Sequence, residues 1–291
     1  MIASMAAFAV EDTFIKTATK QLPIGQVLIL FGAGGAILFA YLTQRSGANL
    51  LTAQVFSKIM MIRAVCELIG RLFYVLAIAL TPLSSATAIL QATPIVVVLG
   101  AIVFFGETVG WRRWCAIVAG LVGVVIILRP GAADFSALSL LAVVGTLGFA
   151  GRDLASRAAP ASLSTSILGL YGFLTVVVAG ALFSLGDAKV FFWPTVANVM
   201  GLAAAVGVGV FAYTALMKAM RSGSISTVTP FRYTRLLFGI SLGMVIFGER
   251  LDGPMIVGCL VVIGSGLFIW WQGKLSTKTA LLSSPVQDPT A

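Results

Sequence analysis

The sequence predicts an all-α integral membrane protein in which ten transmembrane helices form two inverted five-helix repeats. Its apolar composition, the regular spacing of its apolar runs and two motifs that occur twice support this prediction. Of the 291 residues, 59% are hydrophobic and only 10% are charged, whereas about 25% of the residues of a soluble domain are charged. Because this excess of apolar surface has to face lipid, the bilayer is the first partner that we expect.

Turn residues and charges divide the chain into apolar stretches, and a helix needs about 20 residues to cross the hydrocarbon core. Ten spans are expected, at about 1–19, 24–44, 59–80, 83–105, 112–129, 135–156, 163–185, 191–217, 224–248 and 254–272. Pro94 and Pro230 fall inside two of them, where a freed carbonyl needs another partner. Residues 274–291 are polar, with Ser, Thr and Pro, and are expected to form a disordered cytoplasmic tail.

The distribution of Lys and Arg predicts the orientation of the spans, because cytoplasmic loops carry an excess of these residues. With both ends inside, the inner connections hold eleven Lys and Arg and the outer connections hold five. We therefore expect both termini in the cytoplasm. The net charge of +9 is explained by these loops, so no nucleic-acid partner is expected.

Two motifs recur at almost the same distance along the chain. Residues 8–12, Phe-Ala-Val-Glu-Asp, reappear 141 positions later as Phe-Ala-Gly-Arg-Asp at 149–153, and Phe-Gly-Glu at 105–107 reappears 142 positions later at 247–249. Ten spans give five for each copy, and an odd number of crossings makes the copies point in opposite directions. Such inverted repeats are typical of secondary transporters.

The repeat predicts the organisation of the chain. The first repeat should cover residues 1–130 with helices 1 to 5, and the second should cover 131–273 with helices 6 to 10. Gly145, Gly148 and Gly151 are spaced so that they allow close contact between helices.

Two pairs of charges related by the repeat lie in spans 1 and 6. Glu11 and Asp12 are near the middle of span 1, and Arg152 and Asp153 are nearer the inner end of span 6. Charges inside a bilayer are costly and usually face a cavity or a partner. A buried carboxylate can bind substrate, or load and release a coupling proton near neutral pH. The alternatives are that the two aspartates only pair with basic groups, or that span 1 is shifted and its charges are interfacial.

Span 3 carries Arg63, Glu67 and Arg71 at intervals of four residues, so they share one helix face. Glu67 is a candidate for ion coupling, and an internal ion-pair ladder is at least as favoured as a ligand site. Arg71 is the deepest of the three and the strongest candidate for substrate binding. Tyr74 follows on the same side.

Span 9 contains Phe231, Arg232, Tyr233 and Arg235 directly after Pro230. The two arginines share a face, and a guanidinium presents a planar fork that suits a carboxylate or phosphate. The aromatic side chains, together with Tyr74 and Tyr213, could stack on a planar substrate. The alternative is pairing of the arginines with Glu67 or Asp153.

Other features favour structure over chemistry. Glu107 and Glu249 end the fourth span of each half, and we expect them to close a turn. The three cysteines, Cys66, Cys115 and Cys259, lie in apolar stretches and are expected to be buried thiols. The sequence contains no histidine, which removes the usual metal ligand and proton shuttle, so we expect no metal site and no cofactor.

With these residues in view, the chain resembles the drug/metabolite transporter superfamily, in its ten-helix EamA-type branch. The resemblance covers about residues 1–272. It is carried by the two halves, by Leu-Thr-Pro-Leu-Ser-Ser-Ala at 80–86, by Pro94 with the apolar run to Phe-Gly-Glu at 105–107, and by Pro230 with the run to 247–249. It implies ten helices around a central cavity, with helices 5 and 10 towards the periphery.

The resemblance also implies alternating-access transport in the bacterial inner membrane. The stretch at 230–235 looks like members linked to the uptake of riboflavin or S-adenosylmethionine. We therefore expect a secondary transporter of a small polar or planar metabolite, acting as a monomer or homodimer. The alternative is an amino-acid or drug exporter of the same fold. An intramembrane enzyme is disfavoured because no nucleophile has a visible base, and a channel because no filter motif is present.

Overall fold

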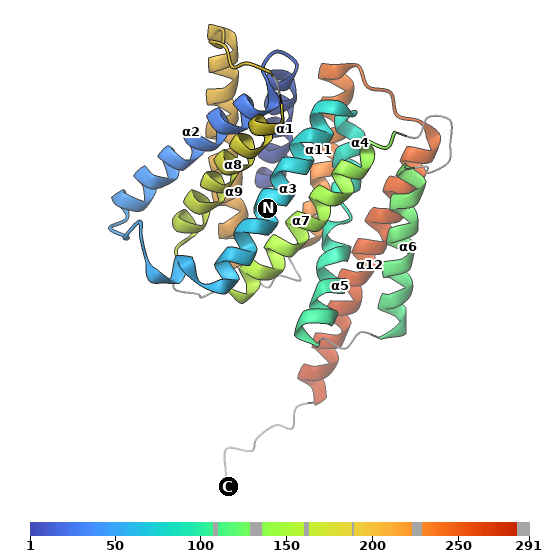
Figure 1. Ribbon diagram of the computed structural model, residues 1–291. Coiled ribbons are helices and arrows are strands. Elements are labelled where there is room, and N and C mark those ends of the chain that lie inside the picture. Colours follow the sequence, from blue (N-terminus) through green and yellow to red (C-terminus); the bar gives the residue numbers. More distant parts are fainter. Residues whose placement is uncertain (107–109, 129–135, 160–162, 188, 223–228, 284–291) are drawn as a thin grey trace.

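The computed structural model describes residues 1–106, 110–128, 136–159, 163–187, 189–222 and 229–283. Within these ranges every regular element is helical (Figure 1). The helices are α1 (Ile2–Thr19), α2 (Ile24–Arg45), α3 (Lys58–Leu80), α4 (Leu83–Leu90), α5 (Thr93–Phe105), α6 (Trp111–Leu128), α7 (Ser139–Ala158), α8 (Thr165–Gly186), α9 (Val196–Ser222), α11 (Thr234–Phe247) and α12 (Gly253–Ser283), with 3-10 turns η1 (Ala53–Phe56) and η2 (Thr229–Tyr233).

Two of the expected spans contain a break. The span expected at 83–105 is divided into α4 and α5 at Gln91 and Ala92, because Pro94 sits in the first turn of α5 and cannot donate a backbone hydrogen bond. In the span expected at 224–248, η2 contains Pro230 and leads into α11 at Thr234. The breaks therefore occur near the two prolines that the sequence analysis placed inside spans.

The chain end differs from the expected tail. Helix α12 continues to Ser283, so the first part of the segment expected to be disordered from residue 274 is helical. Residues 275 and 280–282 are Leu and Ala-Leu-Leu, which are good helix formers. Residues 284–291 lie outside the described part of the chain.

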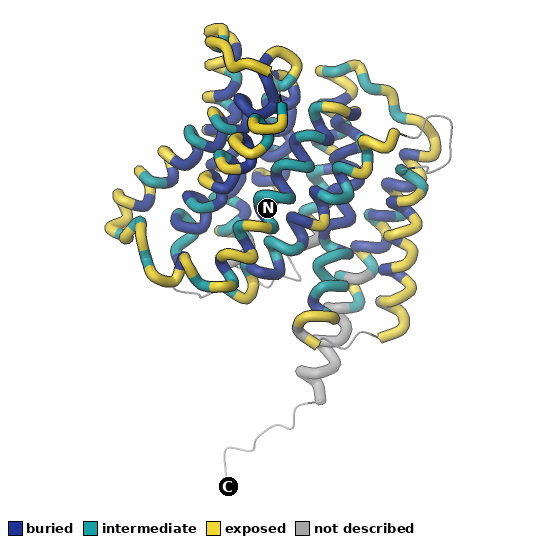
Figure 2. The backbone as a smooth tube through the Cα atoms, viewed as in Figure 1, coloured by how far each residue is buried: buried dark blue, intermediate teal, exposed yellow. Residues whose placement is uncertain are grey.

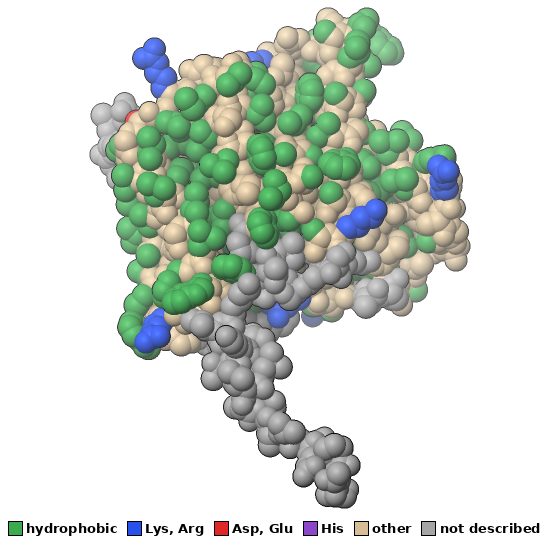
Figure 3. Space-filling view, turned by 180° about the vertical axis from the view of Figure 1, so that it is seen from behind, with side chains coloured by type: hydrophobic (Ala, Val, Ile, Leu, Met, Phe, Trp, Pro, Cys, Tyr) green, Lys and Arg blue, Asp and Glu red, His purple; other side chains and the backbone are tan. Residues whose placement is uncertain are grey.

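By length and composition, five helical segments of the described chain could cross a membrane. They are Ile24–Arg45, Leu83–Phe104, Thr165–Gly186, Val196–Ala219 and Gly253–Gln272. Hydrophobic side chains cover much of the face shown in Figure 3, and only a few Lys and Arg interrupt them. Exposed large apolar side chains occur on most of the helices, for example Val103, Trp111 and Leu185. The chain is therefore a multi-pass membrane protein.

The helices pack in pairs that combine the start and the end of the sequence. Helix α3 lies along α7, α1 along α9, α2 along α8 and α6 along α12. In Figure 1, α6 and α12 stand together at one side of the molecule, and α2, α8 and α9 at the other. The inward faces of the helices are buried (Figure 2), and one large apolar cluster runs through α1, α2, α3, α8 and α9.

Close contact between α3 and α7 depends on small residues. A Cβ atom on Gly148 would collide with the backbone of Gly70, and a Cβ on Gly145 would lie 2.9 Å from the backbone nitrogen of Tyr74. On Gly151 it would lie 2.8 Å from the sulfur of Cys66. The close approach expected from the spacing of these glycines is confirmed. It fixes the charged residues of α3 and α7 against one another.

Glu249 was expected to close the turn at the end of its own span. It has a structural role, but its hydrogen-bond partners are at the start of α4. Its carboxylate accepts hydrogen bonds from the backbone N–H groups of Leu83 (2.6 Å) and Ser84 (2.9 Å) and from the Ser84 hydroxyl (2.7 Å). Lys16 of α1 lies 3.5 Å from the same carboxylate and donates to the Thr81 carbonyl at 2.5 Å. We call Lys16, Thr81, Leu83, Ser84 and Glu249 the capped end of the bundle. Glu107, the repeat partner of Glu249, lies outside the described residues.

Some smaller expectations require correction. Cys115 is exposed and Cys66 is half-buried, so only Cys259 is a buried thiol. Cys115 faces outward from α6, an apolar helix whose outer surface we expect to contact lipid. Lys16, Arg63 and Arg152 were counted as loop cations when the orientation was predicted. They lie inside α1, α3 and α7 and form ion pairs there.

Candidate functional site

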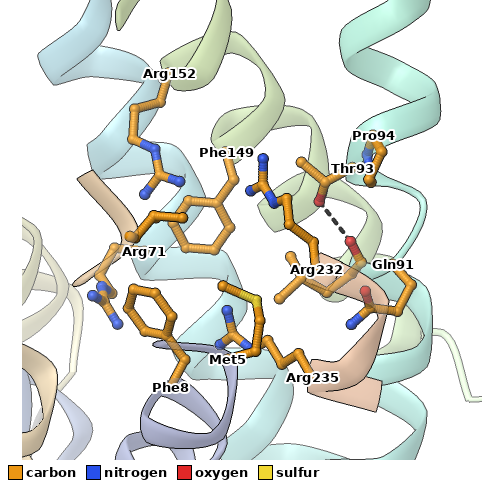
Figure 4. Close-up of a pocket in the computed structure, with 12 residues that line it drawn as sticks. Met5, Phe8, Arg71, Gln91, Thr93, Pro94, Phe149, Arg152, Arg232 and Arg235 are labelled. Atoms are coloured by element: carbon orange, nitrogen blue, oxygen red, sulfur yellow. Dashed lines mark hydrogen bonds between the residues drawn. The ribbon is translucent and has the colours of Figure 1, made fainter. Parts of the chain in front are cut away.

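A polar cavity lies between the first helices of the two predicted halves and the broken helices. The space between these helices measures about 580 Å³, including volume that is open to solvent. The residues that line it are Met5, Phe8, Arg71, Leu90, Gln91, Thr93, Pro94, Phe149, Arg152, Leu216, Arg232 and Arg235. Figure 4 shows the four arginines placed around the aromatic rings of Phe8 and Phe149. No carboxylate is among these lining residues, so the wall is basic and apolar.

Helix α1 supplies two buried carboxylates behind this wall. Glu11 is fully buried and accepts a hydrogen bond of 2.6 Å from Arg71 of α3. Asp12 is 1% exposed and accepts a hydrogen bond of 2.6 Å from Arg235 of α11. The Tyr74 hydroxyl also donates to Asp12, at 3.1 Å. Each of these carboxylates therefore neutralises one arginine of the cavity.

Helix α7 supplies a third carboxylate, which lies between two arginines. One oxygen of Asp153 accepts hydrogen bonds from Arg152 at 2.9 and 3.0 Å. Its other oxygen accepts two from Arg232, both at 3.0 Å. Both oxygens are therefore engaged, and one carboxylate bridges two guanidinium groups that face the cavity.

Glu67 of α3 is the fourth carboxylate, and it is buried between arginines of α3 and α7. It is 3.2 Å from Arg152 and 3.6 Å from Arg63. Arg63 is 1% exposed and also donates to the Tyr213 hydroxyl at 2.8 Å. The expected ladder along α3 exists between Arg63 and Glu67, but Arg71 is paired with Glu11 instead.

The polar residues form a network that stabilises the packing of the helices. Burying a charge is expensive, and removing one partner of a buried pair costs about 3–5 kcal/mol because the other charge is left uncompensated. The ion pairs connect α1 with α3 and α11, and α3 with α7. Buried oxygens of Glu11 and Asp12 still lack a hydrogen-bond partner among the described residues.

Three of the predicted substrate-binding residues line the cavity, namely Arg71, Arg232 and Arg235. The predicted aromatic residues do not. Tyr74 and Tyr213 are 1% and 5% exposed, and their hydroxyls are engaged with Asp12 and Arg63 as described above.

The remaining two predicted aromatic residues also lie elsewhere. Tyr233 is buried against α12, where a Cβ on Gly266 would collide with its ring, and Phe231 is 44% exposed. The aromatic rings at the cavity are instead Phe8 and Phe149. Each is the first residue of the repeated motif, so the repeat itself could have identified them. The predicted coupling residues Glu11, Asp12, Glu67 and Asp153 all lie directly behind the lining.

An apolar helical bundle with charged residues buried around a polar cavity is typical of a multi-pass membrane protein, and the cavity is a candidate binding site. Comparison with known proteins shows which family the chain resembles. Residues 1–129 match the EamA-like transporter family. The resemblance stated from the sequence is therefore confirmed.

Several characterised relatives align with almost the whole chain. A riboflavin transporter of Vibrio cholerae is 28% identical over 286 residues, which is 96% of this chain and 94% of the relative. An S-adenosylmethionine uptake transporter of Rickettsia bellii is 24% identical, covering 93% and 92%. A pseudopaline exporter of Pseudomonas aeruginosa is 26% identical, covering 88% and 89%.

A solved crystal structure also has a similar fold. It superposes with a TM-score of 0.63 over 94% of this chain and 98% of its own, with 17% sequence identity. At this identity the similarity concerns the fold. The relatives are transporters of chemically different compounds, so their names agree on the kind of protein and differ on the substrate.

Proposed function

We propose that this protein is a secondary transporter that moves a small polar or planar metabolite across the bacterial inner membrane by alternating access. The proposal takes α1 to α6 (residues 1–130) and α7 to α12 (residues 131–273) as two inverted repeats with ten spans. Both termini would lie in the cytoplasm. The observation that carries the proposal is the basic cavity between the two halves.

The packing of the helices supports an inverted repeat. If the halves are exchanged, the pair α3 with α7 becomes α9 with α1, and both pairs are in contact. The same exchange converts α2 into α8 and α6 into α12, so the pairs α2 with α8 and α6 with α12 are unchanged. This is expected for helix pairs that lie across a two-fold axis. The contact of α1 with α11 likewise has its counterpart in α7 with α5. An arrangement of this kind lets one half rock against the other around a fixed site.

Discontinuous helices at the cavity also support transport. The fourth span of each half is broken, at Gln91–Ala92 and at η2, and both breaks contribute lining residues. Transporter sites near the bilayer midplane are commonly formed by broken helices. Backbone groups at such a break remain able to bind a substrate, because the helix no longer satisfies all of them.

Polar contacts connect α1, the start of α4 and the residue Glu249 at the capped end of the bundle. The capped end includes Lys16, which is eight residues after Phe8 on α1, or about 12 Å further along the helix. With the proposed orientation the capped end faces outward, and the cavity lies towards the cytoplasm. Opening to the outside would require Glu249 to leave the N-terminus of α4.

The relatives suggest substrates without agreeing on one. Riboflavin and S-adenosylmethionine fit the expectation of a planar or nucleoside-like compound, and the pseudopaline exporter supports export as the alternative direction. An exporter of amino acids or drugs with this fold is the second candidate. The coupling ion would be a proton that binds among Glu11, Asp12, Glu67 and Asp153. Glu11, Asp12 and Glu67 are favoured over Asp153, because each has an oxygen without a hydrogen-bond partner among the described residues, whereas both oxygens of Asp153 are engaged.

The direct test is uptake by proteoliposomes. Purified full-length protein should accumulate a substrate in a saturable manner, and accumulation should increase when a proton gradient is imposed. Arg71→Gln should reduce uptake strongly because Arg71 faces the cavity. Asp187→Asn, in the connection after α8, is the matched control and should transport normally. Non-saturable flux, or full activity in the Arg71 variant, would contradict the proposal.

A further inference from the structure

The charges around the cavity are not balanced. Five arginines form the described network, Arg63, Arg71, Arg152, Arg232 and Arg235, and four carboxylates oppose them, Glu11, Asp12, Glu67 and Asp153. A buried guanidinium remains charged, so the network carries one surplus positive charge. In a low-dielectric site such a charge favours a bound anion.

The surplus can be assigned to one part of the network. Glu11 and Asp12 each bind one arginine of the cavity at 2.6 Å, so these two pairs are balanced. The other two carboxylates, Glu67 and Asp153, serve three arginines. Glu67 is shared between Arg63 and Arg152, and Asp153 is shared between Arg152 and Arg232, so none of these three arginines has a carboxylate of its own. Of the three, Arg152 and Arg232 line the cavity.

Asp153 occupies the position that an anionic ligand would take. It accepts two hydrogen bonds from each of the two guanidinium groups, one group on each oxygen. A carboxylate clamped between two arginine forks is a strong, directional arrangement. The side chains of Asp153 and Arg232 are 15% and 17% exposed, more than the Arg235–Asp12 pair at 14% and 1%. This pair is therefore the most accessible one in the network.

From this geometry we infer that the substrate carries a carboxylate or phosphate group, which binds between Arg152 and Arg232 in competition with Asp153. The inference rests on the proposed transport function and narrows its substrate class. In the structure Asp153 bridges the two arginines. When the substrate binds, its anionic group takes over one or both guanidinium groups, and the surplus positive charge is neutralised.

The rest of the substrate would contact the apolar part of the lining. The Phe149 ring lies under the Arg152 guanidinium, 4.8 Å from its central carbon, and the Phe8 ring lies 5.0 Å from that of Arg235. Both rings belong to the cavity wall. A substrate with an anionic group and a flat or apolar body could therefore contact both the arginines and the aromatic rings of the lining.

The first experiment compares compounds that differ only in the anionic group. Proteoliposomes receive a mixture of amino acids, dicarboxylates, flavin mononucleotide with riboflavin, and S-adenosylmethionine with its decarboxylated form, and their contents are analysed by mass spectrometry. We expect accumulation of compounds that carry the carboxylate or phosphate. Accumulation only of compounds without it overturns the inference and leaves the transport function intact. If no compound accumulates in a protein-dependent manner, whether the compounds are loaded outside or inside the vesicles, the transport function itself is overturned.

The second experiment measures the affinity for flavin mononucleotide and for the dicarboxylate succinate, in detergent and at constant ionic strength. Asp153→Asn removes the competing charge and should tighten binding of the anion by about tenfold, which corresponds to about 1.4 kcal/mol. Arg232→Gln should weaken it by about the same factor, and Arg232→Lys should be intermediate. Asp187→Asn should leave it unchanged.

The sign of the Asp153 effect separates competition from a purely structural role. Loss of a carboxylate that is needed to position the two arginines should weaken anion binding, whereas loss of a competitor should tighten it. Weaker or unchanged anion binding in Asp153→Asn therefore overturns the competition. If that variant does not fold, the Arg232 pair of variants decides, because equal anion binding by Arg232→Gln and the parent protein overturns the inference independently.

Discussion

The capped end gives the sharpest stability prediction, for Glu249→Gln. The carboxylate accepts three hydrogen bonds, from the N–H groups of Leu83 and Ser84 and from the Ser84 hydroxyl, and it lies 3.5 Å from Lys16. Its side chain is only 10% exposed, so solvent screens these contacts weakly. Hydrogen bonds to charged groups contribute about 1.5–3 kcal/mol each, and a carboxylate also stabilises a helix N-terminus.

We expect the amide of the Glu249→Gln variant to retain part of this acceptor capacity. The free energy of unfolding should therefore fall by about 3 kcal/mol, which is less than the sum of the separate contacts, because residual acceptance and relaxation offset part of the loss. The measurement is denaturant titration of the purified protein in detergent micelles. Asp252→Asn, near the start of α12, is the nearby control for removing one negative charge.

A double-mutant cycle with Lys16→Met tests the assigned partner. If Lys16 and Glu249 interact, the cost of Lys16→Met should be smaller in the Glu249→Gln background, with a coupling of about 0.5–3 kcal/mol. Strict additivity of the two changes would refute the ion pair. A fall in stability below about 1 kcal/mol for Glu249→Gln would refute the role of the carboxylate as a buried cap.

Three further predictions concern the network and the packing. Arg71→Gln should destabilise the protein by about 3–5 kcal/mol because it leaves Glu11 buried without its partner, and adding Glu11→Gln should restore most of the loss in the same titration. Gly148→Leu should prevent stable folding, seen as aggregation on size-exclusion chromatography, because a side chain would collide with Gly70; monodisperse protein would contradict the close contact. Pro94→Ala should slow transport with little loss of stability, because it allows the break between α4 and α5 to become regular helix; unchanged transport rates would show that the break is dispensable.

The sequence predicted the helices well because apolar periodicity and turn residues act locally. The bounds of α2 and α3 lie within one residue of the expected spans, and even the broken helices were indicated by Pro94 and Pro230. What the sequence could not specify was how the charges pair. The partner of Arg71 is Glu11, on another helix, although Glu67 is only one turn away on its own.

The aromatic residues illustrate the same limit. A tyrosine beside a buried charge can stack on a ligand or donate its hydroxyl to the charge, and sequence does not distinguish the two. Tyr74 and Tyr213 donate to or accept from the network, because an engaged hydroxyl offsets the cost of burying it. The cavity rings Phe8 and Phe149 have no polar atom to satisfy, so they can face a substrate.

The two copies of the motif have diverged at the position that matters most for charge. In the proposed repeat Glu11 corresponds to Arg152, and the offsets of 141 and 142 place the counterpart of Glu67 at Val208 or Gly209 of α9. Arg152 is bonded to Glu67 at 3.2 Å, whereas the Cβ position of Gly209 lies 3.0 Å from the free oxygen of Glu11. At the contact of α7 with α3, an arginine therefore faces a carboxylate. At the symmetry-related contact of α1 with α9, the carboxylate of Glu11 faces a glycine, which has no side chain.

This divergence explains why the surplus positive charge lies on one side of the cavity. A perfectly repeated protein would present identical charges at both contacts, and an anion would find two equivalent positions. Here the arginine copy contributes Arg152 to the cavity wall, and Asp153, conserved between the copies, is drawn to it and to Arg232. The aspartate of the other copy, Asp12, binds Arg235 alone. An anionic substrate would therefore bind in one orientation, with its charge towards α7 and its apolar body towards α1.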